Sequence, residues 1–327
     1  MHDWPFHLGE LEAQVRAGGG ARGGAIRQAM PDQHRAFFEA LPFVVVASLD
    51  AGDGSDAGRP VATIWSGPPG FVRAPDTETL TFAVAPDAPD PAARAFVAGA
   101  PFGLLGIELA TRRRNRANGV ITSADPRGIT VAVLQSFGNC PQYIHPRELQ
   151  RAAPGAGAPE QFPERFDGLD GDAAQAIARA DTFFVATAAR IAEPTGGVDI
   201  SHRGGPPGFV RVDGDVLTIP DFKGNRYFNT LGNLVSEPRA ALLFVDFATG
   251  DLLHMQGTTE IQWDGPEVRA LHGAERLWRV HVERGWRRRA ALPLRWRSEG
   301  SAEYDDERRV SAAGSDAPAG SAARPGR

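Results

Sequence analysis

One heptapeptide, GPPGFVR, occurs twice in this chain, at residues 67–73 and again at residues 205–211. Seven identical residues do not recur by chance in a chain of 327, so the repeat indicates an internal duplication. Pro-Pro-Gly fixes a turn, and the phenylalanine that follows suits a buried position. We therefore interpret the heptapeptide as a structural turn that two related domains both need.

The similarity extends well beyond the heptapeptide. Leu104–Gly119 aligns without a gap on Leu242–Gly257, and the Leu-Leu, Ala-Thr and closing Gly are shared. Upstream, Phe43–Ser48 matches Phe183–Ala188, and a short helical pattern precedes each segment. A period of about 140 residues is too long for a solenoid repeat and is typical of a duplicated domain.

Both copies have the composition of a mainly β fold. The predicted strands are short, rich in Val, Ile, Phe and Thr, and separated by clusters of Gly, Pro or Asp. They cover Val44–Leu49, Leu80–Val84, Leu104–Leu109, Ile129–Leu134, Leu217–Ile219 and Ala241–Phe247. The few predicted helices include Ala92–Ala98 and Tyr227–Ser236. Because a closed barrel removes exposed sheet edges, we expect β-barrels with a few helices rather than an open parallel sheet.

These patterns predict five parts. They are an N-terminal arm at 1–29, a first barrel at 30–150, a linker at 151–170, a second barrel at 171–298 and a disordered tail at 299–327.

Composition excludes several classes of protein. A net charge of -5 argues against a general nucleic-acid binder, and a single cysteine excludes an intrachain disulfide and a multi-cysteine metal site. No apolar run reaches the roughly 20 residues that cross a bilayer, and no signal peptide is recognisable at the N-terminus. We expect a cytoplasmic protein without membrane, nucleic-acid or metal partners.

The second copy carries a group of cations near one predicted helix. Lys223 and Arg226 precede this helix, Arg203 lies on a neighbouring strand, and Asn225 and Asn229 lie beside them. A helix start offers free N–H groups and the positive end of the helix dipole, and an arginine adds a bidentate fork. These residue types together are what one phosphate monoester requires.

The first copy lacks these cations. Trp65 aligns with Arg203, and nothing in the first copy replaces the charges of Lys223 and Arg226. The duplication therefore predicts one phosphate site, in the second copy.

These residues resemble the FMN-binding split barrels of the pyridoxamine 5'-phosphate oxidase-like family. The run from SHRGGPPGFVRV to PRAALLFVDF is similar to that family's flavin-binding half, and SGPPGFVR with QSFGNCPQYI is similar to a tandem-barrel bacterial branch. The resemblance covers about residues 5–298. It implies two tandem FMN-binding split barrels that form a pseudo-dimer within one chain, with the flavin at their interface.

The resemblance also implies roles for individual residues. Arg203, Lys223 and Arg226 would bind the FMN phosphate. The second-copy residues that would support the phosphate or line the flavin are Ser201, His202, Gly204, Asp221, Asn225 and Asn229. From the first copy, Gln135, Ser136 and Asn139 would hydrogen-bond the flavin ring; the alternative is that their segment only closes its own barrel.

The predicted function is the FMN-dependent oxidation or reduction of a small molecule. No catalytic residue is assigned, and the proton donor near flavin N5 is His202 or water. A separate flavin reductase or a ferredoxin-type protein would supply electrons to a monomer or homodimer. The alternative is a non-enzymatic flavin-binding protein, or a haem or deazaflavin binder on the same scaffold. Arg279 and His281 have the Arg-x-His spacing of a substrate motif of pyridoxamine phosphate oxidases without its surroundings, so vitamin B6 oxidation is not predicted.

Three other features have a structural and a functional interpretation. We interpret Arg112, Arg114 and Arg116 as a solvated hairpin face rather than a contact to a phosphate or an acidic redox partner. Cys140 is interpreted as a buried small side chain rather than a reactive thiol. His254 is interpreted as a core residue rather than a haem ligand.

Overall fold

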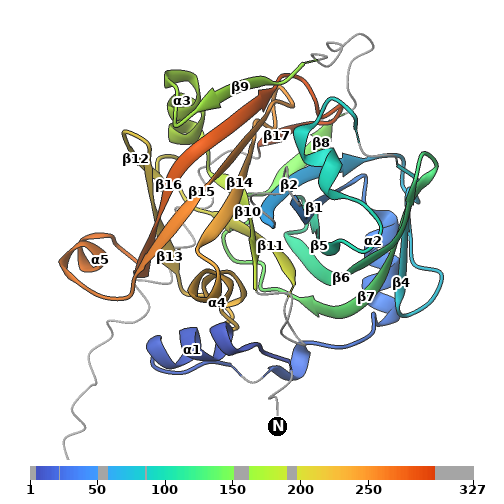
Figure 1. The fold of residues 1–327 in the computed structure, drawn as a ribbon, viewed down its shortest axis with the longest axis horizontal. Coiled ribbons are helices and arrows are strands. Elements are labelled where there is room, and N and C mark those ends of the chain that lie inside the picture. The colour runs from blue at the N-terminus through green and yellow to red at the C-terminus, as the bar shows by residue number, and fades with distance from the viewer. Residues whose placement is uncertain are drawn as a thin grey trace, which may run out of the picture.

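The structure, a computed structural model, describes residues 5–21, 23–50, 58–84, 87–150, 162–189 and 197–298. Most of the strands form two antiparallel sheets that lie side by side, one from each copy of the repeat (Figure 1). The predicted disordered tail at 299–327 lies outside the described residues, as do residues 151–161 of the predicted linker.

Both large sheets have the same strand order. The first contains β1 (Phe43–Asp50), β2 (Arg59–Ser66), β3 (Val72–Arg73), β4 (Thr79–Phe82), β5 (Pro101–Glu108), β6 (Arg113–Asp125) and β7 (Gly128–Gly138), in the order β2-β1-β5-β6-β7-β4-β3. The second contains β10 (Thr182–Ala188), β11 (Val198–Gly204), β12 (Arg211–Asp213), β13 (Val216–Phe222), β14 (Arg239–Val245), β15 (Leu252–Gln262) and β16 (Ala274–Arg288), in the order β11-β10-β14-β15-β16-β13-β12. The mainly β fold is confirmed, and the matching orders are compatible with two tandem split barrels.

Three further strands extend this framework. β8 (Arg147–Gln150) pairs with β17 (Arg295–Ser298) in a small sheet that joins the end of one copy to the end of the other. β9 (Glu164–Asp167) pairs with β16, so this part of the predicted linker is a strand of the second sheet. The physical reason is burial: the Phe166 ring packs closely over Gly285 and beneath the Arg287 guanidinium.

The shared heptapeptide forms the same turn in both copies. Its fourth residue, Gly70 or Gly208, has a positive φ of 89° or 81°, which glycine adopts without steric cost. The next residue, Phe71 or Phe209, is buried in the core of its own sheet. The structural interpretation of this segment is therefore correct.

The helices are few and short. They are α1 (Leu8–Arg16), α2 (Asp32–Ala40), α3 (Gly171–Arg179), α4 (Asn229–Ser236) and α5 (Pro266–Ala270), with 3₁₀ turns at Gly23–Ala25 and Pro91–Ala95. The helix predicted at Ala92–Ala98 is thus only a 3₁₀ turn, which the Asp90 side chain caps. The helix predicted from Tyr227 begins two residues later, because Arg226 and Phe228 have positive φ angles of 60° and 63°. Among the described residues, no helix is long and apolar enough to cross a membrane.

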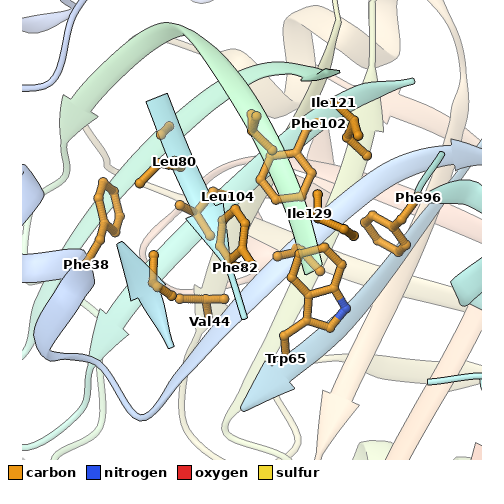
Figure 2. Packing of buried hydrophobic residues seen from close by; sticks show 14 of the residues in the cluster. Phe38, Val44, Trp65, Leu80, Phe82, Phe96, Phe102, Leu104, Ile121 and Ile129 are labelled. Carbon is orange, nitrogen blue, oxygen red and sulfur yellow. The ribbon is translucent and has the colours of Figure 1, made fainter. Parts of the chain in front are cut away.

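Aromatic side chains fill the core of the first sheet. Trp65 packs against Phe82, Phe96 and Phe102, with ring centroids 5.2, 4.9 and 5.7 Å away (Figure 2). Trp65 is 4% exposed. The residue that aligns with Arg203 is therefore part of a core, which leaves it unable to serve a ligand.

An apolar cluster joins the two sheets. It combines Phe43, Val45 and Leu105 of the first copy with Phe184 and Leu243 of the second. Burial of this surface gives the two copies a fixed relation, so side chains from both can converge on one site.

The described part of the N-terminal arm packs on the second copy. α1 crosses α4, as Figure 1 shows, and the backbones of Gly9 and Gly232 meet there because neither residue has a side chain. The Glu10 side chain is buried at this crossing and accepts hydrogen bonds from His7 N and from Asn229 Nδ2. The arm therefore holds the segment that precedes and begins α4.

Candidate cofactor-binding cleft

A cleft lies where edge strand β11 of the second sheet meets β6 and the segment after β7 of the first. Its polar lining from the second copy is Ser201, His202, Arg203, Asp221, Asn225, Arg226, Asn229, Thr230, Glu275 and Arg276. From the first copy it is Arg114, Arg116, Asn139, Cys140, Gln142 and Tyr143. The cleft is therefore built by both copies, and its walls carry an excess of arginine.

Most of the residues predicted for the site line this cleft. They are Ser201, His202, Arg203, Gly204, Asp221, Asn225, Arg226, Asn229 and Asn139.

Three predicted residues do not line it. The Lys223 side chain is exposed, and only its backbone oxygen accepts a hydrogen bond, from the Tyr143 hydroxyl at 3.1 Å. Gln135 donates to Pro5 O at 3.2 Å and so binds the arm. Ser136 is fully buried and bonds His34 Nδ1 at 2.8 Å and Arg116 O at 3.2 Å. The Gln135 side chain thus contacts the arm, and the Ser136 side chain contacts other parts of the first copy.

Asp221 organises one wall of the cleft. Its Oδ1 accepts from Arg203 at 2.5 Å and its Oδ2 accepts from Arg276 at 2.5 Å. Arg276 also pairs with Glu275 at 2.9 Å. Arg203 keeps a buried Nε that has no partner among the described residues, so this arginine is positioned by Asp221 and still has a donor available.

Arg226 lines the cleft but its guanidinium binds the arm. Nη2 donates to Ala17 O at 2.9 Å, and Nε donates to Gly19 O at 3.0 Å. The predicted trio of Arg203, Lys223 and Arg226 is therefore not assembled around one point. The left-handed conformation of Arg226 turns this residue toward the carbonyls at the end of α1.

Two arginines of the first copy take part instead. Arg116 is 6% exposed and pairs with Asp199 at 2.8 Å, whereas Arg114 Nη1 lies 2.9 Å from His202 Nδ1. No described carboxylate pairs with Arg114, and burial, together with the charges of Arg116 and Arg203, lowers the pKa of Arg114 to about 9. The interpretation of Arg114 and Arg116 as a solvated face is wrong, because β6 directs both toward the second copy.

The interpretation of Cys140 is also wrong. This thiol is exposed and lines the cleft. The segment after β7 that carries it turns toward the second copy, where Tyr143 stacks on Phe222 at 5.4 Å.

Several buried polar atoms around the cleft have no hydrogen-bond partner in the part of the chain that the structure describes. They are Nε of Arg114, Arg116 and Arg203, Nε2 of His202 and Oδ1 of Asn139. A buried polar group without a partner is costly, so such atoms mark a place where a ligand is expected. The start of α4 adds to this set, because no side chain caps it. Donors predominate, which suits an anionic ligand with several acceptor atoms.

The equivalent position in the first copy is closed. Thr63 donates to Asp90 at 2.5 Å, and Arg288 pairs with the same carboxylate at 3.2 Å. His254 is buried next to them, stacks on Trp286 at 4.7 Å and hydrogen-bonds Ala62 O at 3.0 Å. The two copies thus differ as the sequence predicts, with an open cationic cleft in one and packed side chains in the other.

Parts of this chain are similar to known proteins. The family model for pyridoxamine 5'-phosphate oxidase matches residues 169–295. A search of the curated proteins returns no significant match. Among solved structures, HupZ of Group A Streptococcus is 18% identical over 35% of this chain and 90% of its own, with a TM-score of 0.28. A candidate pyridoxamine 5'-phosphate oxidase of Lactobacillus delbrueckii is 12% identical over 34% of this chain and 95% of its own, with a TM-score of 0.25.

The family match covers the second copy of the repeat. The sheet of this copy contributes the edge strand β11 to the cleft. Residues 169–295, which form most of the second copy, match the pyridoxamine 5'-phosphate oxidase family.

Proposed function

We propose that this protein binds FMN in the cleft between its two copies and uses it to oxidise or reduce a small molecule. The observation that supports this best is the set of unpartnered buried donors, contributed by Arg114, Arg203 and His202 around the uncapped start of α4. A mononucleotide offers a phosphate dianion and a ring with several acceptor atoms, which is the complement of that set.

The phosphate is proposed to bind Arg203 and the first backbone N–H groups of α4. The Asp221 carboxylate holds the Arg203 side chain, and the arm holds the segment around Arg226 and Asn229. Few side chains therefore lose conformational freedom when the ligand binds. Arg114 and Arg116 bring further positive charge from the first copy.

The flavin, when bound, supplies the hydride or electron transfer, and the chain orients it and limits its contact with water. No residue is required as a nucleophile. We propose that electrons come from a separate reductase or a ferredoxin-type protein.

The test compares FMN with riboflavin, which lacks only the phosphate. We expect wild-type protein to show the absorption bands of oxidised flavin and to bind FMN more tightly than riboflavin. Arg203→Gln should weaken FMN binding by about tenfold or more, because it removes a charged hydrogen bond, and should change riboflavin binding little. Fluorescence titration measures both affinities.

The matched control is Lys223→Gln, which removes a cation that precedes the same helix but is exposed outside the cleft. We expect wild-type affinity for FMN. Equal losses in the Arg203 and Lys223 variants, or a haem spectrum in place of a flavin spectrum, would contradict the proposal.

A further inference from the structure

We propose that His202 is a fixed, neutral hydrogen-bond donor of the cleft, with its Nδ1 occupied by Arg114 of the first copy and its Nε2–H directed to an acceptor atom of the ligand. The inference rests on the proposed function only for the identity of the ligand. The state of the imidazole itself is independent of it.

The tautomer follows from the chemistry of the contact. Arg114 Nη1 lies 2.9 Å from His202 Nδ1, and a guanidinium donates hydrogen bonds but cannot accept them. Nδ1 must therefore present its lone pair, and in a neutral ring the proton lies on Nε2. That Nε2 is buried and has no partner within the described part of the chain. His202 lines the cleft and is 5% exposed. Its Nε2–H is therefore a donor that is fixed in place and is available to a ligand.

The surroundings keep the ring neutral. Arg114 on β6, Arg147 on β8, Arg203 on β11 and His145, which precedes β8, act on it electrostatically, and its ring makes an edge contact with Phe184 at 5.8 Å. Burial and these cations hold the pKa of His202 well below its ordinary value of 6.5. The ring can thus donate a hydrogen bond without carrying a charge, and it is a poor source of a proton for a reaction.

The first copy shows that the scaffold does not need this pair. Ile64 aligns with His202, and Leu252 aligns with Arg114. Ile64 and Leu252 both pack in the apolar cluster between the sheets. Where the cleft is closed, apolar contacts are enough to hold the edge strand, and the polar pair occurs only where the cleft is open.

The first experiment needs no ligand. Nitrogen NMR of the full chain, with labelled histidine and with His202→Gln to assign the signal, reports which ring nitrogen carries the proton. We expect a neutral Nε2–H ring that does not titrate between about pH 5 and 8. Arg114→Met should release the restriction and give a mixture of tautomers. A proton on Nδ1, or titration within this range in the wild type, would overturn the proposal.

The second experiment locates the acceptor with FMN and riboflavin as probes. His202→Leu removes the donor, whereas His202→Gln keeps an N–H near the Nε2 position and His202→Asn places one near Nδ1. We expect about tenfold weaker FMN binding for the Leu and Asn variants, and a loss of less than threefold for Gln. A matching loss for riboflavin assigns the acceptor to the ring or ribityl chain, and a loss confined to FMN assigns it to the phosphate.

Folding is checked separately by thermal unfolding, with the exposed His272→Leu as the control for loss of a histidine. Wild-type FMN affinity in a folded Leu variant would overturn the proposal. If the wild type binds no FMN, the proposed function fails, and the NMR measurement still decides the inference about His202.

Discussion

The most unusual single residue outside the cleft is Glu10 on α1. Its carboxyl group is buried at the crossing of α1 and α4, where it accepts from His7 N at 3.0 Å and from Asn229 Nδ2 at 2.5 Å. Burial outweighs these hydrogen bonds and raises the pKa of Glu10 from 4.5 to about 8. The protonation state of this arm residue therefore depends on its packing against the second copy.

This shift predicts a pH dependence of stability. The folded protein holds the Glu10 proton more tightly than the unfolded chain, so the free energy of unfolding falls as pH rises from about 4.5 to about 8, by up to about 1.4 kcal/mol per pH unit. Above about pH 8 both states have lost the proton and this contribution is constant. Glu10→Gln cannot titrate, so urea unfolding should show the variant gaining on the wild type across that range. Parallel profiles of the two proteins would show that Glu10 is already ionised in the folded state.

At the scale of elements, the crossing of α1 and α4 depends on absent side chains. A Cβ placed on Gly232 would lie 2.5 Å from Glu10 Cα and 2.7 Å from Glu10 N, which are backbone atoms that cannot move aside. A Cβ on Gly9 would meet Gly232 O at 2.2 Å. The arm and the site helix therefore fit together in this way because Gly9 and Gly232 have no side chains.

Gly232→Ala tests this packing. Alanine favours a helix by up to about 1 kcal/mol, but we expect a net loss of about 1–3 kcal/mol in the free energy of unfolding, because α1 must shift away. The control is Gly171→Ala at the first residue of α3, where a Cβ meets nothing within 4 Å. Urea unfolding measures both variants. Equal stabilities of the two would mean that α1 does not depend on a close approach to α4.

The elements also show how far the sequence could predict this protein. Short runs rich in Val, Ile, Phe and Thr between clusters of Gly, Pro or Asp located the strands, because these residue types favour strands and turns respectively. The start of α4 was misplaced, since nothing local announces the left-handed residues Arg226 and Phe228. The interpretation of Arg114 and Arg116 as solvated overlooks their alignment with Leu252 and His254 of the second copy, which are both buried. This alignment is the sequence signal that predicts burial for the two arginines.

Arg276 was not predicted at all. It reaches the cleft because β16 pairs with β13, which sets Arg276 opposite Asp221 across the sheet. That pairing joins residues far apart in the chain, so no local pattern near Arg276 marks it as a site residue.

In the whole molecule, the duplication has produced two sheets with the same strand order. An open cleft lies at the second sheet, and packed side chains fill the equivalent place at the first. The open cleft takes its edge strand from the second copy and Arg114, Arg116 and Asn139 from the first, so neither copy contains the whole site. The apolar cluster between the sheets holds these contributions in register.

This asymmetry predicts one FMN per chain. At the equivalent place, Trp65 is locked among aromatic rings, and Asp90, 3% exposed, pairs with Arg288, which is 5% exposed. A ligand there would have to break a buried ion pair, at a cost of about 3–5 kcal/mol, before gaining any contact of its own. We expect a titration to reach its end point at one equivalent of FMN per chain, and the same ratio from flavin absorbance against protein concentration. An end point at two equivalents would show that the first copy opens, because a second ligand cannot fit beside those packed side chains.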